Sequence, residues 1–572
     1  MPLPLIESNT RPATTLLVRP SWFVIQLTIT ASLGGCLFGY DLGAISGTLS
    51  QLTTTFDLDN SQKELIVSIL YMGGTIGAAC GGSVCDRIGR KTSIILTDII
   101  FIVGSLWLYF SSSYEQVIVG RFIIGIGIAI SGIADVSYLH ECSPIQYRGS
   151  IVSVNEACIS LGFLLAYISG FIFSSHEKEE WRIVFGIAGF LAAIQFIGML
   201  LLPESPEWLI EKGRLDDAKK ASARINGTAS TTDSNDNPTI ATYHNQSSRS
   251  FGFIIRHRIE SIVMILSQYR RQVYIALYLA IVQQLCGQTN ILNYAPLIFE
   301  EATNQDNNEQ QEQQQQNYNE NNNDYYEYPE DDASLEDDWS MVIIGVVKCI
   351  VTILVIWKIE YIGRRRLLIF GNLLIAIGLL ALIIAFDNND DDDSSASTTF
   401  WSPLTNVKTF HLALPGVLLV VCGYSCSFGP LTWLLTSELF PTNIRGRALG
   451  ASTIVSYMFG AISTQTFLFA TSRYGPSFVF GMYCIITVCG VFFVYMAIPD
   501  TGEKTVPEID DSLNDMPWWK YDPKILLPQY DSSTTPPPSL EMTSEQFSTT
   551  DTNNASTRTS SSSSLDQQHV LS

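Results

Sequence analysis

The sequence predicts an all-α integral membrane protein with twelve membrane-spanning helices, arranged as two bundles of six. Three observations support this fold class. Of the 572 residues, 47% are hydrophobic and only 15% are charged, which is too apolar for a soluble protein of this size. The apolar residues fall into twelve runs of about 20 residues, the length that crosses a bilayer as a helix. Two motifs of the first half recur in the second half, which indicates an internal duplication.

Each apolar run is expected to form one membrane-spanning helix. The first run keeps Asp41 and is not followed by a small-residue cleavage site, so we expect an uncleaved first span and not a signal peptide. The runs lie near residues 22–48, 62–84, 94–112, 117–140, 151–173, 183–202, 273–299, 341–359, 367–386, 411–436, 448–470 and 477–498.

The duplication is visible in two motifs at the ends of apolar runs. GSVCDRIGRK at 82–91 returns in altered form as WKIEYIGRRR at 357–366. ECSPIQYRG at 141–149 and ELFPTNIRG at 438–446 both read E-x-x-P-x-x-x-R-G without a gap. Each half of the chain therefore carries the same two motifs in the same order.

The spacing of the acids in these motifs supports the duplication. Asp86 and Glu141 lie 55 residues apart, whereas Glu360 and Glu438 lie 78 residues apart. The difference of 23 residues is the length of one Asp/Ser-rich insert at 387–409. Without that insert, the two halves share one internal spacing.

Changes of composition divide the chain into segments. Two low-complexity acidic inserts are expected within the second bundle, at 300–339 and 387–410. The predicted segments are an N-terminal tail (1–20), a first bundle (21–202), a linker with short helices and a disordered insert (203–272), a second bundle (273–499) and a disordered C-terminal tail (500–572).

The net charge of −22 comes mostly from the two inserts. Residues 300–338 contain 14 acids and no lysine or arginine, and residues 387–393 contain five more acids. The rest of the chain is close to neutral, as expected for helices in a lipid bilayer. The charge therefore does not indicate a nucleic-acid partner or an acidic binding surface.

Lysine and arginine are concentrated in alternate loops, which the positive-inside rule assigns to the cytoplasm. With an even number of spans, both termini are expected on that face and the acidic inserts on the opposite one. The basic clusters lie at 87–91, 148, 212–224, 256–258, 270–271, 364–366 and 445–447.

Neither the cysteines nor the other reactive side chains form a recognisable site. All eleven cysteines lie within or at the ends of spans, so no disulfide framework is indicated. Cys80 and Cys85 are not accompanied by histidine, which favours packing over metal binding. No nucleophile–base–acid set, metal cluster or phosphate loop indicates an enzyme, and no cofactor is expected.

Seven ordered motifs between about residues 20 and 500 resemble those of the sugar porter branch of the major facilitator superfamily. The resemblance implies two six-helix bundles around a central substrate cavity, which alternates between outward-open and inward-open states. The motifs are GYDLGAISG (39–47), DRIGRK (86–91), YLHECSPIQYRG (138–149), PESPEWL (203–209), QQLCGQTN (283–290), EYIGRRR (360–366) and GPLTWLLTSELFPTNIRG (429–446).

Acids and bases in the repeated motifs are expected at cytoplasmic helix ends. There they can form salt bridges between helices at an inner gate, which must break when the gate opens. Simple positive-inside anchoring is the alternative, although it does not require the repeated acid–base spacing. The predicted gate residues are Asp86, Arg87, Arg90, Glu141, Arg148, Glu360, Arg364, Arg365, Glu438 and Arg445.

The resemblance also implies a set of substrate-binding residues. Gln283 and Gln284 match paired glutamines of the seventh span, and their amides can both donate to and accept from a sugar hydroxyl. Trp433 matches a tenth-span tryptophan whose flat face suits sugar C–H groups. An inter-helix hydrogen bond is the alternative role for the glutamines. Asn290 and Asn293 complete the predicted amide set.

The predicted substrate-binding set also includes Glu156 and Lys348, and three of its positions depart from the common pattern. Glu156 and Lys348 stand where a fifth-span glutamine and an eighth-span asparagine are usual, and the family amide after Gly287 comes one residue late, at Asn290. The two charged residues, with the long loop between spans nine and ten, resemble the third class of facilitative glucose transporters. We predict an ion pair between Glu156 and Lys348. Separate hydration in a wet cavity, or an anionic substrate on Lys348, are the alternatives.

Asp41 and Arg121 are the predicted proton-coupling pair. The resemblance places an acid in the first span near a fourth-span arginine, and changes in that contact can load and release a proton. A static salt bridge between two helices is the alternative reading.

The resemblance thus implies transport of a hexose or related polyol, which we expect to be coupled to protons. Facilitative uniport is the alternative within transport, and a non-transporting nutrient sensor is the alternative from another class. We expect a monomer in the lipid bilayer without a nucleic-acid partner, in the plasma membrane, with a vacuolar or endosomal membrane as the alternative.

Overall fold

A computed structural model describes residues 21–144, 148–173, 179–226, 269–303, 332–386, 409–502, 504 and 506–517. These residues all fall within one compact unit, residues 1–522. The middle of each acidic insert, most of the N-terminal tail, the predicted disordered part of the linker and the chain beyond residue 517 lie outside the described residues. What is described is α-helical, with turns and short connections.

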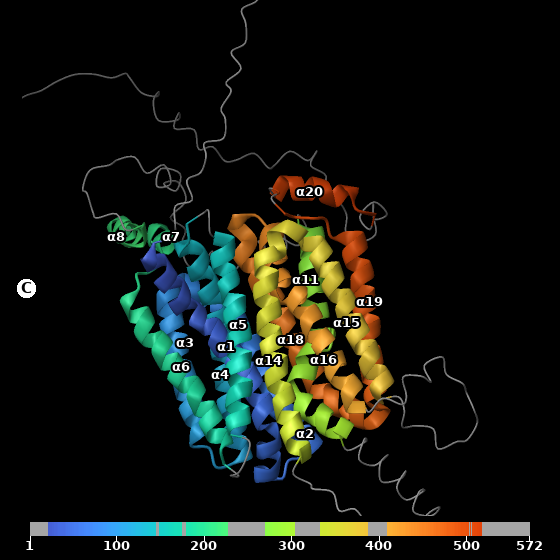
Figure 1. The fold of residues 1–572 in the computed structure, drawn as a ribbon. Coiled ribbons are helices and arrows are strands. Elements are labelled where there is room, and N and C mark those ends of the chain that lie inside the picture. Colours follow the sequence, from blue (N-terminus) through green and yellow to red (C-terminus); the bar gives the residue numbers. More distant parts are fainter. Residues whose placement is uncertain are drawn as a thin grey trace, which may run out of the picture. The chain divides into compact units, whose positions relative to one another are not determined.

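Six long helices form the first half of the structure: α1 (Trp22–Phe56), α2 (Asn60–Ile88), α3 (Arg90–Tyr109), α4 (Tyr114–Cys142), α5 (Arg148–Ile172) and α6 (Trp181–Leu201). Two short helices follow, α7 (Pro206–Glu211) and α8 (Leu215–Asn226). The second half contains α11 (Arg270–Leu285), α12 (Gln288–Asn293), α14 (Asp332–Ile362), α15 (Arg364–Phe386), α16 (Thr409–Cys426), α17 (Phe428–Leu439), α18 (Thr442–Tyr474) and α19 (Pro476–Ala497), and α20 (Val506–Asp515) follows it (Figure 1).

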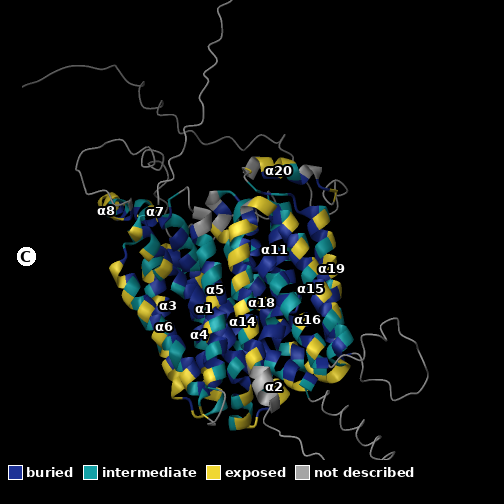
Figure 2. Ribbon diagram, in the orientation of Figure 1, coloured by how far each residue is buried: buried dark blue, intermediate teal, exposed yellow. Residues whose placement is uncertain are grey.

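Twelve helical segments of the described chain are long and apolar enough to cross a membrane, counting α11 with α12 and α16 with α17. This confirms the predicted number of spans. Large apolar side chains on the outward faces are exposed, among them Phe190 on α6 and Trp357 on α14 (Figure 2). Such a surface fits lipid as its surroundings.

Local sequence signals set several helix ends. Asp59 and Gln62 form a reciprocal capping box at the start of α2, with Asp59 Oδ1 accepting from the Gln62 N–H at 2.8 Å. Gly89 (φ 100°) separates α2 from α3, and Gly363 (φ 89°) separates α14 from α15. Both values lie in a region that side chains other than glycine rarely adopt, so each repeated motif ends one helix and starts the next.

Two spans are interrupted, although the sequence predicted continuous helices at 273–299 and 411–436. In the seventh span, Gly287 (φ 84°) stops α11 and starts α12, and a further helical segment occupies 295–303. In the tenth span, Ser427 leaves the helical conformation between α16 and α17. Interrupted helices in transporters commonly mark the substrate path.

Small residues allow the closest helix contacts within each half. A methyl carbon on Gly39 of α1 would lie 1.9 Å from the carbonyl oxygen of Ile159 on α5. A methyl carbon on Gly371 of α15 would lie 2.5 Å from the carbonyl oxygen of Gly423 on α16. Backbones therefore touch directly at these contacts, as in many membrane-helix interfaces.

The two halves meet where α2 packs on α18 and α5 packs on α14. Near the end where α1 meets α2, Glu64 Oε1 accepts from the Phe469 N–H at 2.7 Å, and Ser68 Oγ donates to Gln465 Oε1 at 2.5 Å. These side chains hold the halves together at that end. α7, α8 and α20 lie at the opposite end, where α2 meets α3 (Figure 1).

Two predicted low-complexity segments contain helix. The C-terminal tail was expected to be disordered from residue 500, but α20 lies within it and buries Ile509 and Leu513, and Met516 directly after the helix is also buried. These residues recur at helical spacing and form one apolar face. The acidic insert predicted at 300–339 ends earlier than expected, because α14 begins at Asp332.

Candidate functional site

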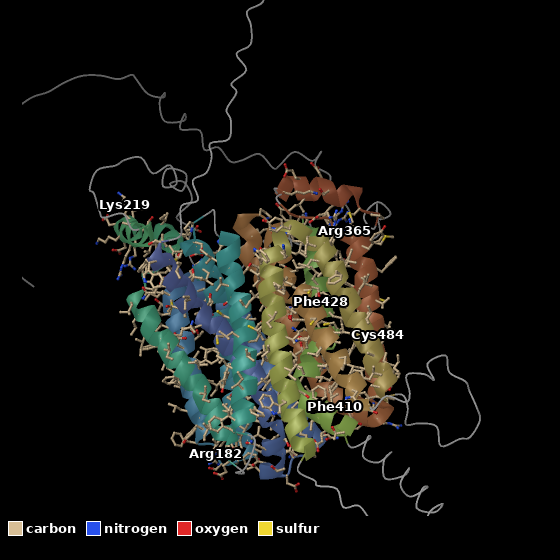
Figure 3. All side chains as sticks on the ribbon, viewed as in Figure 1. Arg182, Lys219, Arg365, Phe410, Phe428 and Cys484 are labelled. Atoms are coloured by element: carbon tan, nitrogen blue, oxygen red, sulfur yellow. The ribbon has the colours of Figure 1, made fainter. Side chains whose placement is uncertain are left out.

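The paired glutamines lie in the last turn of α11, just before the break in the seventh span. Gln283 is buried, and its Nε2 donates to the Tyr424 hydroxyl at 3.1 Å and to the Phe428 carbonyl oxygen at 3.3 Å. Its Oε1 is buried without a hydrogen-bond partner. Phe428 starts α17, midway along the helices of the second half (Figure 3). Gln283 therefore joins both interrupted spans and keeps one free acceptor.

Lys348 of α14 lies among aromatic rings and not against a carboxylate. Its Nζ is 5.0 Å from the ring centre of Phe163 on α5 and 5.4 Å from that of Tyr424 on α16. Both distances are typical of cation–π contacts. Because Tyr424 also accepts from Gln283, this tyrosine connects the lysine with the glutamine. The sequence analysis did not single out Tyr424, which lies outside the quoted motifs.

Glu156 of α5 approaches the same region from the first half. Its Oε1 lies 3.1 Å from the position that a methyl carbon on Gly429 of α17 would take. Glu156 and Lys348 interact electrostatically, yet no direct ion pair joins them. The ion pair predicted between them is therefore not formed in this structure. The charges instead flank Tyr424 and the start of α17.

The asparagines of the predicted set differ from one another. Asn290 is fully buried, and its Nδ2 donates to the Ser463 hydroxyl at 2.9 Å and to the Tyr483 hydroxyl at 2.7 Å. Its Oδ1 accepts from Thr464 at 3.1 Å. Asn290 thus ties α12 to α18 and α19, with its amide already occupied. Asn293 instead reaches Tyr71 of the first half, with a long N···O distance of 3.5 Å.

Gln284 and Trp433 retain partial exposure within the spans. Gln284 Nε2 donates to Ser456 Oγ at 2.8 Å, and its Oε1 accepts from Thr289 at 3.3 Å. Trp433 lies on α17, and buried residues precede and follow it along that helix. The surrounding residues therefore enclose neither the Gln284 nor the Trp433 side chain completely. Within the predicted set, Gln284, Trp433 and Glu156 are partly exposed, whereas Gln283, Asn290, Asn293 and Lys348 are buried.

Asp41 and Arg121 form a buried ion pair between α1 and α4. The resemblance implied that they lie close together, and their role in proton coupling stays a prediction. Asp41 Oδ2 and Arg121 Nη1 are 2.9 Å apart, and both side chains are 0% exposed. The guanidinium also lies 5.9 Å from the ring centre of Phe185 on α6. Asp41 Oδ1 and Arg121 Nη2 have no hydrogen-bond partner, so the contact uses one oxygen and one nitrogen of the possible two.

The repeated motifs form matching ion pairs in the two halves. Arg90 Nε lies 2.9 Å from Glu141 Oε1, and Arg364 Nη2 lies 3.3 Å from Glu438 Oε1. Each arginine directly follows the positive-φ glycine of its motif, and each glutamate begins E-x-x-P-x-x-x-R-G. The equivalence of the pairs supports the internal duplication. Both pairs join helices of the same half and do not cross between halves.

A hydroxyl completes each pair, which the sequence analysis missed. Ser205 Oγ donates to Glu141 Oε2, and Thr501 Oγ1 donates to Glu438 Oε2 at 2.5 Å. Ser205 belongs to Pro-Glu-Ser at 203–205, and Thr501 belongs to Pro-Asp-Thr at 499–501. This third repeated element, after the sixth and twelfth spans, could have been found by aligning the two halves.

The remaining gate residues are placed differently. Asp86 approaches Arg90 at 3.5 Å with its side chain 63% exposed, and Arg87 is exposed. Arg365 donates from Nη2 to the Tyr495 carbonyl oxygen at 2.5 Å, and it lies at the end of the helices near α20 (Figure 3). The predicted gate residues whose side chains lie outside the described part are Arg148, Glu360 and Arg445.

Arg90 and Arg87 provide a matched pair of variants for this motif. We expect Arg90→Gln to lower the free energy of unfolding by about 1.5–3 kcal/mol, the range for a hydrogen bond to a charged group. Arg87→Gln should change it by less than about 0.5 kcal/mol, because the side chain is exposed. Thermal unfolding of the purified protein measures both. Equal losses in the two variants would contradict a specific role for the Arg90–Glu141 pair.

Comparison with known proteins assigns the fold and the family. The profile of the family described as "Sugar (and other) transporter" matches residues 27–311 and 324–513. The chain is 31% identical to the Danio rerio protein "Solute carrier family 2, facilitated glucose transporter member 10", with 86% of this chain and 93% of that protein covered. It is 28% identical to the Xenopus laevis member 12 of the same family, covering 86% and 90%.

A solved structure agrees with these matches. The major facilitator superfamily proton:xylose symporter XylE, bound to 6-bromo-6-deoxy-D-glucose, superposes with a TM-score of 0.64 at 25% identity. The alignment covers 86% of this chain and 100% of that one. The matched proteins are transporters, so transport and not catalysis is the activity class. The chain belongs to the sugar transporter family of the major facilitator superfamily and is a multi-pass integral membrane protein.

Proposed function

We propose that the protein moves a hexose or a related polyol across the plasma membrane by alternating access, and that transport is coupled to protons. The Asp41–Arg121 pair carries the coupling part of this proposal, because both groups are buried in the membrane at 0% exposure. Arginine keeps its charge at all relevant pH values, so Asp41 is the group of the pair that can change its protonation. Its buried carboxylate is stabilised in the ionised form only while it contacts the guanidinium.

Movement of α1 relative to α4 would separate this pair. A buried carboxylate that loses its cation takes up a proton, since an isolated charge in a membrane interior is strongly disfavoured. Return of the contact would release the proton on the other side. Asp41 would thereby alternate between an ion pair and a protonated acid during the transport cycle.

Substrate contacts are proposed for Gln283, Gln284 and Trp433, with Glu156 and Lys348 at the border of the same site. The support is their position around the two interrupted spans, together with the unpartnered Oε1 of Gln283. Asn290 is assigned a positioning role, because its amide already bonds to α18 and α19.

The test of coupling uses Asp41→Asn in proteoliposomes with an imposed pH gradient. We expect the variant to lose accumulation of labelled sugar against its gradient while it retains downhill counterflow. A matched control, Glu115→Gln, removes an exposed acid at the start of α4 and should keep accumulation. If Asp41→Asn still concentrates sugar with wild-type pH dependence, Asp41 is not the coupling residue.

Facilitative uniport is the second candidate, favoured by the names of the two vertebrate relatives, both of which are facilitated glucose transporters. Under uniport, the pH gradient drives no accumulation in the wild type, while sugar still equilibrates. A protein that neither accumulates nor equilibrates any hexose or polyol would instead favour the nutrient-sensor reading.

A further inference from the structure

A cavity of about 400 Å³ lies between α8, the start of α3 and the connection from α6 to α7. Its volume is within the range of small-molecule sites, about 300–1,000 Å³. It is at the end of the helices where α7 and α8 lie, which the positive-inside rule assigns to the cytoplasm (Figure 1). None of its lining residues belongs to the proposed substrate site or to the Asp41–Arg121 pair.

Basic side chains outnumber acidic ones in the wall of this cavity. The four bases are Lys91, Arg214, Lys220 and Arg224, and the two acids are Glu204 and Asp217. An excess of one sign in a concave surface raises the local concentration of ions of the opposite sign. The attraction for an anion therefore depends on how far the two acids neutralise the four bases.

Glu204 is held by backbone donors at the start of α3. Its Oε1 accepts from the N–H groups of Lys91 and Ser205, both at 2.9 Å. The N-terminus of a helix carries a partial positive charge, which stabilises a carboxylate at this position. Among the described residues, no lysine or arginine forms an ion pair with Glu204. Its charge is therefore balanced largely by the backbone around the start of α3.

Asp217 is occupied by one of the four bases. Its Oδ2 accepts from Arg214 Nε at 3.0 Å and from Arg214 Nη2 at 2.7 Å. Lys220 Nζ is 3.8 Å from the other oxygen, and its side chain is 79% exposed. Arg224 forms no ion pair within the described chain, and its guanidinium lies 5.8 Å from the ring centre of Phe23 on α1. Lys220 and Arg224 are four residues apart on α8, so they form one basic face.

Lys91 lies at the edge of the lipid-facing surface. Its Nζ donates to the carbonyl oxygens of Leu202 at 2.6 Å and of Leu200 at 3.2 Å, at the end of α6. Leu200 and Leu201 are 52% and 61% exposed, as expected for a helix end that contacts lipid. An ammonium group has three N–H donors, so one remains for a ligand. The cavity therefore begins where the apolar outer surface ends.

The three bases Lys91, Lys220 and Arg224 suit a phosphate group, which arginine binds through two parallel N–H donors and lysine as a point charge. Basic pockets at the cytoplasmic ends of membrane helices bind phospholipid headgroups in other proteins. We propose that these three residues bind a phosphate-bearing anion in this cavity. The position at the membrane edge favours a phospholipid headgroup over a soluble phosphate ester.

The second half of the chain gives an internal comparison. α20 follows the twelfth span as α7 and α8 follow the sixth, yet α20 contains four acids and no base. α8 contains three bases and two acids. Because the Arg–Glu pair and its hydroxyl occur in both halves, those contacts do not require the basic face of α8. The basic face therefore has a separate role in the first half, which the proposed ligand supplies.

Thermal unfolding of the purified full-length protein in detergent tests the site, since a ligand of the folded state raises the Tm as its concentration rises. The protein is titrated at constant ionic strength with dioctanoyl phosphatidic acid and with glycerol 3-phosphate, which is the same headgroup without acyl chains. Dioctanoyl phosphatidylcholine is the control lipid, because its choline group neutralises the phosphate. We expect a saturable rise in Tm with phosphatidic acid that phosphatidylcholine does not reproduce.

The soluble headgroup identifies the source of the phosphate. A rise in Tm that requires the acyl chains assigns the cavity to a phospholipid. An equal rise with glycerol 3-phosphate at the same concentrations assigns it to a soluble phosphate ester. A wild type that responds to neither phosphate compound, or that responds equally to the two lipids, would overturn the proposal.

Variants assign the response to the cavity. Lys220→Gln and Arg224→Gln should each raise the half-maximal concentration about tenfold, the effect of losing one hydrogen bond to a charged group. Both side chains are exposed, so the fold should be retained. Lys219→Gln removes an exposed base of α8 outside the cavity wall and should keep the wild-type response (Figure 3). A half-maximal concentration that is the same in all three variants would also contradict the proposed site.

Discussion

Gly39→Ala should prevent recovery of folded protein. The added methyl carbon would lie 1.9 Å from the Ile159 carbonyl oxygen, and both groups belong to helix backbones that cannot move independently. The reciprocal position, Gly162 on α5, would place a methyl carbon 2.1 Å from the Cys36 carbonyl oxygen. Overpacking of a close contact usually costs about 1–3 kcal/mol, and a backbone-to-backbone overlap of this size should exceed that range.

A matched substitution separates this steric effect from the general effect of alanine in a helix. Gly132 on α4 has no neighbouring atom within 4 Å of its methyl position, so Gly132→Ala should stabilise the protein by about 0.5–1 kcal/mol. Fluorescence-detected size-exclusion chromatography followed by thermal unfolding measures both variants. A monodisperse Gly39→Ala protein with wild-type Tm would show that α1 and α5 do not pack as closely as described.

The close contact at Gly39 also positions the coupling pair, because Asp41 lies half a turn further along α1. A shift of α1 away from α5 would move Asp41 relative to Arg121 on α4. The fold and the site are therefore linked through one helix. Any Gly39→Ala protein that does fold should therefore transport more slowly than the wild type even at temperatures well below its Tm.

The long-range organisation was predictable because it rests on composition and repetition. Twelve apolar runs and two repeated motifs are properties of the linear chain, and the contact between Asp41 and Arg121 followed from a family resemblance at both positions. The matching pairs Arg90–Glu141 and Arg364–Glu438 lie within the predicted gate set.

What the sequence did not predict depends on packing between segments far apart in the chain. The break at Gly287 requires a positive φ, which a glycine permits but does not impose. The apolar face of α20 contains only a few residues, and its low-complexity surroundings obscured it. Tyr424 gains its role only when α14 and α16 bring Lys348 and a tyrosine together.

Changes at Glu156 and Lys348 should affect sugar uptake strongly and not independently. Lys348 is 3% exposed. Removing its ammonium would leave the carboxylate of Glu156 without the positive charge with which it interacts. Because the two do not touch, we expect a coupling free energy of about 1 kcal/mol, near fivefold in rate, and not the 3–5 kcal/mol of a broken direct pair. Glu156→Gln and Lys348→Asn should each lower uptake, and the double variant should lose less than the product of the single losses.

A third variant distinguishes the contributions of charge and packing at Lys348. Lys348→Met keeps the length of the side chain between Phe163 and Tyr424 but removes the cation. The part of the loss of uptake that is common to Lys348→Met and Lys348→Asn is therefore the contribution of the positive charge. Tyr424→Phe removes the hydroxyl that accepts from Gln283 and should lower uptake even with Lys348 intact.

Initial uptake rates of a neutral hexose and of a sugar acid, normalised to surface protein, measure all five variants. Strictly multiplicative losses would exclude coupling between the two charges. Selective loss of the sugar acid in Lys348→Met would instead assign the ammonium to an anionic substrate, because only that substrate carries the charge that the lysine would neutralise.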